Sequence, residues 1–160
     1  MNAGTTRLAA LMAEAVEISI SHVDSGGIPF VGLLVDDGWA SEPGVNLVRE
    51  TGDRTAHAEI VAMREAAQAR GSAGLEGLTL LATGEPCGLC YRVAAAHGIA
   101  AVHFAVGRDD AAEWGFDYRV GYREADRLPL AMTAHHLAVD RGLVPFERYR
   151  ALHHPGLTTP

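Results

Sequence analysis

The stretch GEPCGLC, residues 84–90, holds both cysteines of the chain, Cys87 and Cys90. The apolar run LTLLATG (78–84) before it predicts a strand, and GLCYRVAAAHG (88–98) predicts a short helix that ends at a glycine. A helix that begins at about Cys87 puts both thiols on one face of its first turn. The positive end of the helix there favours thiolates, which are the form of cysteine that metals bind.

Two thiols at this spacing allow three kinds of site: a redox pair, half of a structural zinc site, or two ligands of a catalytic zinc. The strand-to-helix position suits a redox pair, but no other feature of the sequence supports one. A closed structural zinc site needs four protein ligands, and the paired histidines lack the spacing of a zinc-finger arm. We therefore interpret the following as surface or packing histidines: His22, His97, His103, His135, His136, His153 and His154.

His57 differs, because it stands in TAHAE at the start of a second predicted helix, residues 56–70. Glu59 follows two residues later and would point about 200° away on an ideal helix. Both side chains can serve one site only beyond the N-terminal end of that helix, where the helix carrying Cys87 and Cys90 can also begin. Three protein ligands and a fourth position open to water are typical of catalytic zinc. Glu59 is then the candidate base.

The rest of the chain alternates between strand and helix patterns. Strands are predicted at 30–37, toward 45–48 and at 100–107, with DDG (36–38) as a hairpin turn, and helices at 6–20, 109–114, 129–141 and 145–152. An opening hairpin followed by this alternation predicts an α/β fold, a three-layer α/β/α sandwich around a mixed central sheet. A length of 160 residues suits one domain, 1–160, in which we expect residues 129–152 to close the pocket.

The net charge of −7 and the absence of any block of Lys or Arg argue against nucleic acid as a partner. That balance favours a small neutral or cationic substrate. No apolar run approaches the ~20 residues that span a membrane. Glu14 and Glu17 interrupt the N-terminal segment at helical spacing, so we interpret it as a helix of the fold and expect a cytoplasmic protein.

The motifs H-x-E and P-C-x-x-C, in this order, are the signature of zinc-dependent nucleobase deaminases. Over nearly its whole length the chain resembles the cytidine deaminase superfamily, and within it the bacterial guanine deaminase branch. The resemblance is carried by GGIPFVGLLV (26–35), PGVNLVRETGDRTAHAEI (43–60), GEPCGLC (84–90), DDAAEWGFDY (109–118) and PFERYRAL (145–152).

The resemblance implies a cytidine deaminase-like fold, bound Zn²⁺ and hydrolytic release of ammonia from a nucleobase or related heterocycle, with guanine as the leading candidate. It also implies a homodimer, because a partner subunit often contributes near the pocket in this family. The roles it implies are zinc ligation by His57, Cys87 and Cys90, proton transfer by Glu59, hydrogen bonding to the base by Asn46, pocket lining by Phe30, and contact of the Ala58 amide with a ring carbonyl.

One departure from the branch concerns Tyr118, which stands where the pattern has a second aspartate after Gly-Phe-Asp. Asp117 remains, and we expect both residues beside the substrate. Tyrosine is bulkier than aspartate and neutral at pH 7 unless its pKa is shifted. This departure leaves cytosine, another aminopurine, a triazine or a nucleoside open as the substrate beside guanine. Trp114 and Phe116 are expected to pack in the fold.

Two other functions remain open at this point. A tRNA adenosine deaminase shares both motifs, although the acidic charge and the missing basic tail argue against it. A non-catalytic zinc module would need the three ligands but no base, so Glu59 is the feature that separates it from an enzyme.

Overall fold

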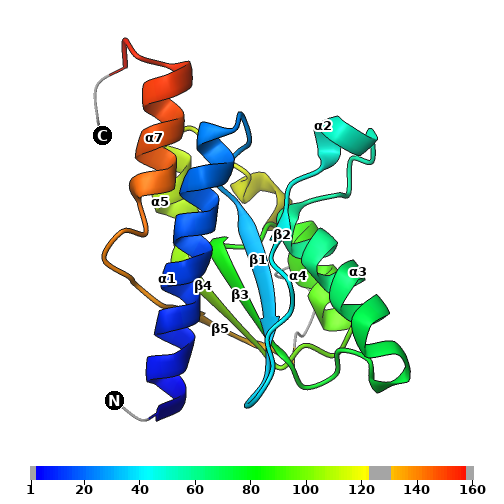
Figure 1. Ribbon diagram of the computed structural model, residues 1–160. Coiled ribbons are helices and arrows are strands. Elements are labelled where there is room, and N and C mark those ends of the chain that lie inside the picture. The colour runs from blue at the N-terminus through cyan, green and yellow to red at the C-terminus, as the bar shows by residue number, and fades with distance from the viewer. Residues whose placement is uncertain (1–2, 123–130, 158–160) are drawn as a thin grey trace.

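The computed structural model of the chain describes residues 3–122 and 131–157. A mixed five-stranded sheet runs through its middle, with the strands in the order β2-β1-β3-β4-β5 (Figure 1). The strands are β1 (Val31–Val35), β2 (Gly44–Val45), β3 (Thr79–Gly84), β4 (Ala101–Val106) and β5 (Thr133–His136). β1 pairs antiparallel with β2 and β3, whereas β3, β4 and β5 run parallel to one another.

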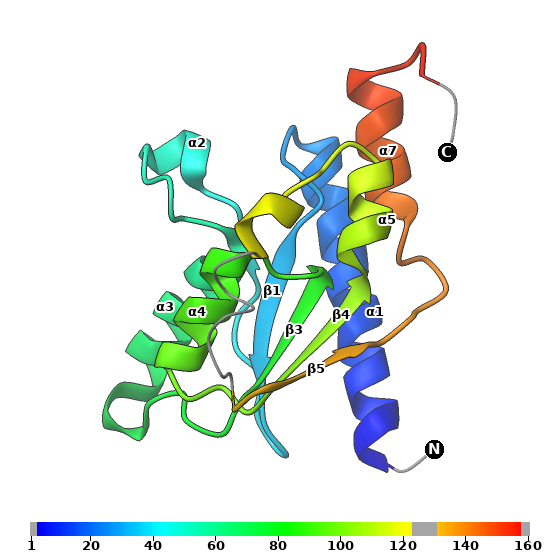
Figure 2. The same ribbon diagram turned by 180° about the vertical axis from the view of Figure 1, so that it is seen from behind.

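Helices cover both faces of the sheet, which confirms the predicted three-layer α/β/α arrangement (Figures 1 and 2). One layer holds α1 (Ala3–Asp24), α5 (Arg108–Glu113) and α7 (Val144–His153). The other layer holds α3 (Ala58–Arg70) and α4 (Gly88–Ala96). Three short helical turns complete the described elements: α2 (Val48–Thr51), η1 (Gly71–Ala73) and η2 (Arg119–Gly121). No helix in the described part of the chain is long and apolar enough to cross a membrane.

The apolar strands β1 and β3 separate two cores, because successive side chains point to opposite faces. Leu34 and Leu80 face the core under α3 and α4. Leu33 and Leu81 face the other core, where they pack with Met12 of α1. Burial on both faces explains why these strands are continuous apolar runs rather than alternating ones.

The predicted hairpin turn forms, but the second strand is shorter than expected. The carboxylate of Asp36 accepts hydrogen bonds from the backbone N–H groups of Gly38 (3.0 Å) and Trp39 (2.9 Å), which fixes the turn. The prediction of a strand toward 45–48 is wrong after Val45, where β2 ends, and α2 begins at residue 48. Asn46 explains the change, since its side-chain oxygen accepts a hydrogen bond from the backbone N–H two residues on (3.1 Å).

The helix predicted at 129–141 is wrong. Residues 129 and 130 lie outside the described residues, and the rest holds β5 instead, which continues the sheet beside β4. The segment is rich in helix-forming alanine and leucine. The open edge of β4 overrides that preference, because it offers carbonyls to the segment's backbone N–H groups, as in Leu137 to Phe104 (2.8 Å). The helices predicted at 109–114 and 145–152 are confirmed as α5 and α7.

Candidate metal centre and active site

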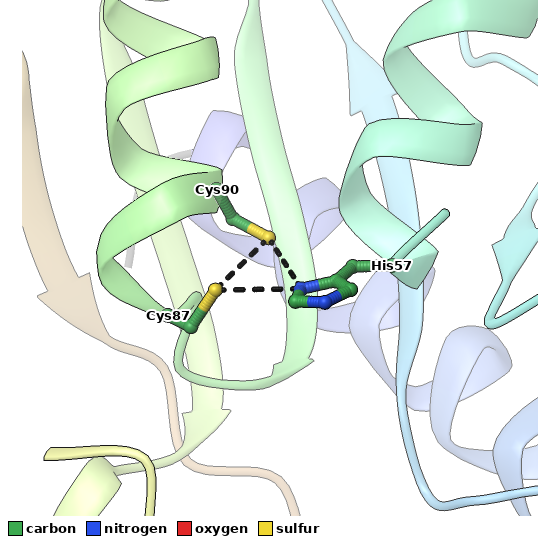
Figure 3. A group of neighbouring side chains, drawn as sticks. All are labelled: His57, Cys87 and Cys90. Carbon is green, nitrogen blue, oxygen red and sulfur yellow. Dashed lines mark hydrogen bonds between the residues drawn. The ribbon is translucent and has the colours of Figure 1, made fainter. Parts of the chain in front are cut away.

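Three ligand atoms meet between the first turns of α3 and α4 (Figure 3). The Nδ1 atom of His57 lies 3.4 Å from the sulfur of Cys87 and 3.5 Å from that of Cys90. The two sulfurs lie 3.5 Å apart. His57 and Cys87 each occupy the extended position just before a helix, so each side chain projects beyond the helix end. Cys90 follows inside the first turn of α4.

The spacing of these atoms fits a tetrahedral zinc ion. With ordinary bond lengths, such an ion holds two sulfurs about 3.8 Å apart and a sulfur and a nitrogen about 3.6 Å apart. The observed separations of 3.4 to 3.5 Å are within a few tenths of an ångström of those values. Within residues 3–122 and 131–157, no other His, Cys, Asp and Glu side chains form a group of this kind. His57, Cys87 and Cys90 thus form a possible zinc site.

The protonation of the three groups is coupled. Hydrogen bonding between the thiols lowers the pKa of Cys87 to about 4 and raises the pKa of Cys90. The hydrogen bond to Cys87 raises the pKa of His57. The cysteines are not bonded to each other, because their sulfurs are well beyond the ~2.05 Å of a disulfide. These shifts favour a thiolate at Cys87 while Cys90 keeps its proton and the protonated form of His57 is favoured. A metal cation bound by the three atoms would instead favour loss of the protons on Cys90 and His57.

Glu59 lies next to this cluster, in the first turn of α3. Its side chain is only 4% exposed, and one carboxylate oxygen lies 3.5 Å from the sulfur of Cys90. Burial raises the pKa of Glu59 to about 7. The structure thus brings His57 and Glu59 to one place, although they are two residues apart on the chain.

A cavity of about 160 Å³ opens onto this group. It contains four of the five residues that the sequence predicts to contact substrate, together with most of the cluster. Its lining consists of Ile28, Phe30, Asn46, His57, Ala58, Glu59, Glu85, Cys87 and Tyr118. Cys90 is fully buried behind it.

Aromatic rings form one wall of the cavity. The rings of Phe30 and Tyr118 meet edge to face with their centres 6.0 Å apart. Phe116 and Phe146 pack against Phe30 from behind, at 5.3 and 5.6 Å. The expectation that Phe116 packs in the fold is therefore confirmed, and Trp114 likewise packs beside α7, with the guanidinium of Arg150 over its ring.

Asp117 is the predicted contact residue that the structure does not bring to the cavity. Its carboxylate turns outward and pairs with Arg119 at 2.8 Å, and its side chain is 54% exposed. Hydrogen bonds from Arg119 lower the pKa of Asp117 to about 2. Tyr118 turns inward instead, since its hydroxyl donates to the backbone carbonyl of Glu85 at 2.6 Å. Burial raises the pKa of Tyr118, so the hydroxyl stays a neutral donor.

Sequence reasoning missed two lining residues, Ile28 and Glu85. Glu85 is 6% exposed and its carboxylate pairs with Arg108 at 2.7 Å. The sequence does contain a signal for Glu85, since this acidic residue stands directly between a predicted strand and the Pro-Cys pair. Ile28 carries no comparable signal in the sequence.

Comparison with known proteins gives the following matches. The model of the cytidine and deoxycytidylate deaminase zinc-binding region matches residues 5–106. Guanine deaminase from Bacillus subtilis is 33% identical over 142 residues, which cover 87% of this chain and 91% of that protein. A tRNA-specific adenosine deaminase from the same organism is 40% identical over 80 residues, which cover 49% of each chain. The X-ray structure of the B. subtilis guanine deaminase aligns with a TM-score of 0.68 and 29% identity, covering 100% of both chains.

Proposed function

The chain belongs to the cytidine and deoxycytidylate deaminase zinc-binding family, and from this premise we propose that it deaminates a free nucleobase, with guanine as the leading substrate. The family makes the protein a zinc-dependent hydrolytic deaminase. The observation that carries the proposal is the position of Glu59. A buried carboxylate beside three metal ligands, inside a small cavity, suits proton transfer and is not needed in a purely structural zinc module.

The size of the cavity supports a free base as substrate. Its volume of about 160 Å³ is well below the roughly 300–1,000 Å³ of pockets that hold drug-sized ligands. A planar heterocycle suits such a space better than a nucleoside or a tRNA loop. The net charge of −7 also disfavours a polyanion, whose phosphates would need neutralising.

The geometry of the cavity lining supports three kinds of contact with the base. The side-chain oxygen of Asn46 is bonded to the N–H of Val48, which leaves the amide NH₂ to donate toward a ring acceptor. The backbone N–H of Ala58 lies in the first turn of α3, where such groups lack an intrahelical partner and can bind a carbonyl oxygen. The Phe30 and Tyr118 rings close the side.

Zinc, when bound, supplies Lewis acidity and lowers the pKa of a water molecule. Glu59 then accepts a proton from the attacking water and delivers it to the ring nitrogen beside the amino-bearing carbon. The water oxygen bonds to that carbon, and Glu59 transfers the second proton to the amino group. The carbon–nitrogen bond breaks and ammonia leaves, so the amino group has been exchanged for a carbonyl. Asn46 and Ala58 hold the ring in one orientation throughout.

The guanine assignment also draws on the relatives. The B. subtilis guanine deaminase resembles this chain over most of both lengths, whereas the tRNA-specific adenosine deaminase resembles about half. Tyr118 is the residue that could shift the preference toward cytosine, another aminopurine or a triazine, because it forms part of the cavity wall.

The test is ammonia release by zinc-loaded protein from guanine, cytosine, adenine, an aminotriazine, guanosine, cytidine and tRNA. We expect kcat/KM for guanine to exceed that for guanosine and cytidine by at least about 100-fold, since the cavity of about 160 Å³ is small. Preferred turnover of another free base would leave the proposed mechanism intact and replace guanine as the proposed substrate. Preferred turnover of a nucleoside or tRNA would overturn the proposal.

Assembly and location are further parts of the proposal. We propose a homodimer, supported by β5, whose four residues are all exposed at the edge of the sheet. Light scattering on the purified protein would report a mass near 34 kDa, twice the 16.9 kDa of one chain. We also propose that the segment 129–152, of which the structure describes 131–152, closes the pocket. Phe146 of α7 supports this, because it packs on Phe30 of the cavity wall. We further propose that the protein is cytoplasmic.

A further inference from the structure

The segment that carries Cys87 to its position has little backbone support of its own. Residues 85–87 join β3 to α4 and belong to neither. The N–H of Glu85 donates to the carbonyl of Val106 at 2.8 Å, but Pro86 has no N–H to offer. The carbonyl of Cys87 accepts the first hydrogen bond of α4, from the N–H of Tyr91 at 3.0 Å, which leaves the carbonyls of residues 85 and 86 as the other backbone acceptors of the segment.

Two tyrosine hydroxyls bind those two consecutive carbonyls. Tyr118 donates to the carbonyl of Glu85 at 2.6 Å, and Tyr122 donates to the carbonyl of Pro86 through a short hydrogen bond. The turn η2 between them brings the tyrosines to the same side, with their ring centres 6.2 Å apart. Tyr122 is only 3% exposed.

The same segment is also held through the side chain of Glu85, which forms an ion pair. The guanidinium of Arg108 binds the Glu85 carboxylate at 2.7 and 3.1 Å, and the backbone N–H of Arg108 adds a bond of 2.8 Å. Tyr91 donates to the same carboxylate at 3.2 Å. The guanidinium carbon of Arg108 also lies 3.4 Å from the centre of the Tyr122 ring. Arg108 therefore contacts both the Glu85 carboxylate and the Tyr122 ring. Arg108 and Tyr91 thus occupy the carboxylate of Glu85, although Glu85 lines the cavity.

We propose that Tyr118 and Tyr122, the second of them held by Arg108 of the Arg108–Glu85 ion pair, are positioning residues that fix the Cys87 sulfur for metal binding. Their hydroxyls act by holding the two peptide groups directly before Cys87, a function separate from that of the Tyr118 ring, which lines the cavity. Partners that orient metal ligands typically change metal affinity by about 10–100-fold when they are removed. The consequence for catalysis rests on the proposed function, whereas the consequence for zinc affinity does not.

The experiment compares zinc dissociation constants of Tyr118→Phe and Tyr122→Phe by competition with a chromogenic chelator. Each change removes one hydroxyl and keeps the ring. Tyr149→Phe is the matched control, because it also removes one hydroxyl and keeps the ring, here in α7, where the Tyr149 ring packs on Phe116. We expect the dissociation constant to rise at least about tenfold in both variants and to stay unchanged in the control.

Unfolding of the metal-free variants separates positioning from plain structural support. A lower melting temperature with unchanged zinc affinity would overturn the proposal, and so would equal losses in all three variants. If Tyr122→Phe fails to fold, Tyr118→Phe alone decides the outcome. Activity is then measured on the base that the protein turns over. Tyr122→Phe should lose activity in zinc-limited buffer and regain it in excess zinc. If no base is turned over, the proposed function fails and the affinity result still stands.

Discussion

Gly32 of β1 lies directly against Glu59, because a Cβ atom at position 32 would sit 2.9 Å from the Cα of Glu59. Gly44 of β2 makes a similar approach, with a Cβ position 2.5 Å from the carbonyl oxygen of Ala58. The first turn of α3 can therefore rest on the β1–β2 hairpin only because two glycines face it. This contact places His57 and Glu59 relative to the sheet and to Cys87.

The first prediction follows from that contact. Gly32→Ala should push the first turn of α3 outward, lower the free energy of unfolding by about 1–3 kcal/mol and reduce kcat/KM by at least about tenfold. Gly38→Ala is the control, since no atom lies within 4 Å of its Cβ position in the same hairpin. Denaturant unfolding and ammonia release measure both effects. Full activity in Gly32→Ala would mean that the contact does not position the site.

The second prediction concerns the metal. Cys87→Ala should leave two ligands and lose the zinc, so its melting temperature should equal that of metal-free wild type. Chelator should lower the melting temperature of wild type and leave Cys87→Ala unchanged, because a ligand that binds only the folded state stabilises it. Atomic absorption should find about one zinc per wild-type chain. Equal zinc content in both proteins would exclude Cys87 as a ligand.

The third prediction separates two functions of Asn46. Its side-chain oxygen caps the N–H of Val48, and its NH₂ group is proposed to donate to the base. Asn46→Asp keeps the capping oxygen and removes the donor, so stability should hold while kcat/KM falls by about 10–100-fold. Asn46→Ala should lose both. Wild-type kinetics in Asn46→Asp would mean that Asn46 stabilises the turn but does not bind the base.

The fourth prediction concerns acid stability of the loop before His57. Hydrogen bonds from Thr55 and Arg64 lower the pKa of Asp53 from 3.8 to about 2. Ionised Asp53 therefore contributes stability above about pH 4, and that contribution disappears as the pH falls through about 2. The melting temperature of chelator-treated Asp53→Asn should lie below wild type at pH 6 and converge with it near pH 2. Asp37→Asn, the same chemical change on an exposed turn, is the matched control.

The three residues of the possible zinc site could be predicted from the sequence because their signals are local. His57 and Cys87 each stand at a helix start that the flanking residues announce, and the short H-x-E and C-x-x-C spacings fix the rest. The alternation of apolar runs likewise predicted the layers. These features depend on neighbours in the chain, which a sequence displays directly.

The errors arose where a distant partner decides the structure. Thr133–His136 became a strand because β4 offers an open edge about thirty residues earlier in the chain. Asp117 and Tyr118 could have turned either way, and their orientation depends on Arg119 outside and on the carbonyl of Glu85 inside. The inward tyrosine, and the ion pair of Glu85, therefore needed the three-dimensional structure.

The most direct test of the account is ammonia release from guanine by zinc-loaded wild type and Glu59→Gln. Glu65→Gln is the matched control, because Glu65 makes the same chemical change on the exposed side of α3. We predict that Glu59→Gln retains its zinc and loses about 10²–10⁴-fold in kcat, whereas Glu65→Gln matches wild type. Wild-type turnover by zinc-loaded Glu59→Gln would contradict proton transfer by Glu59 and with it the proposed mechanism.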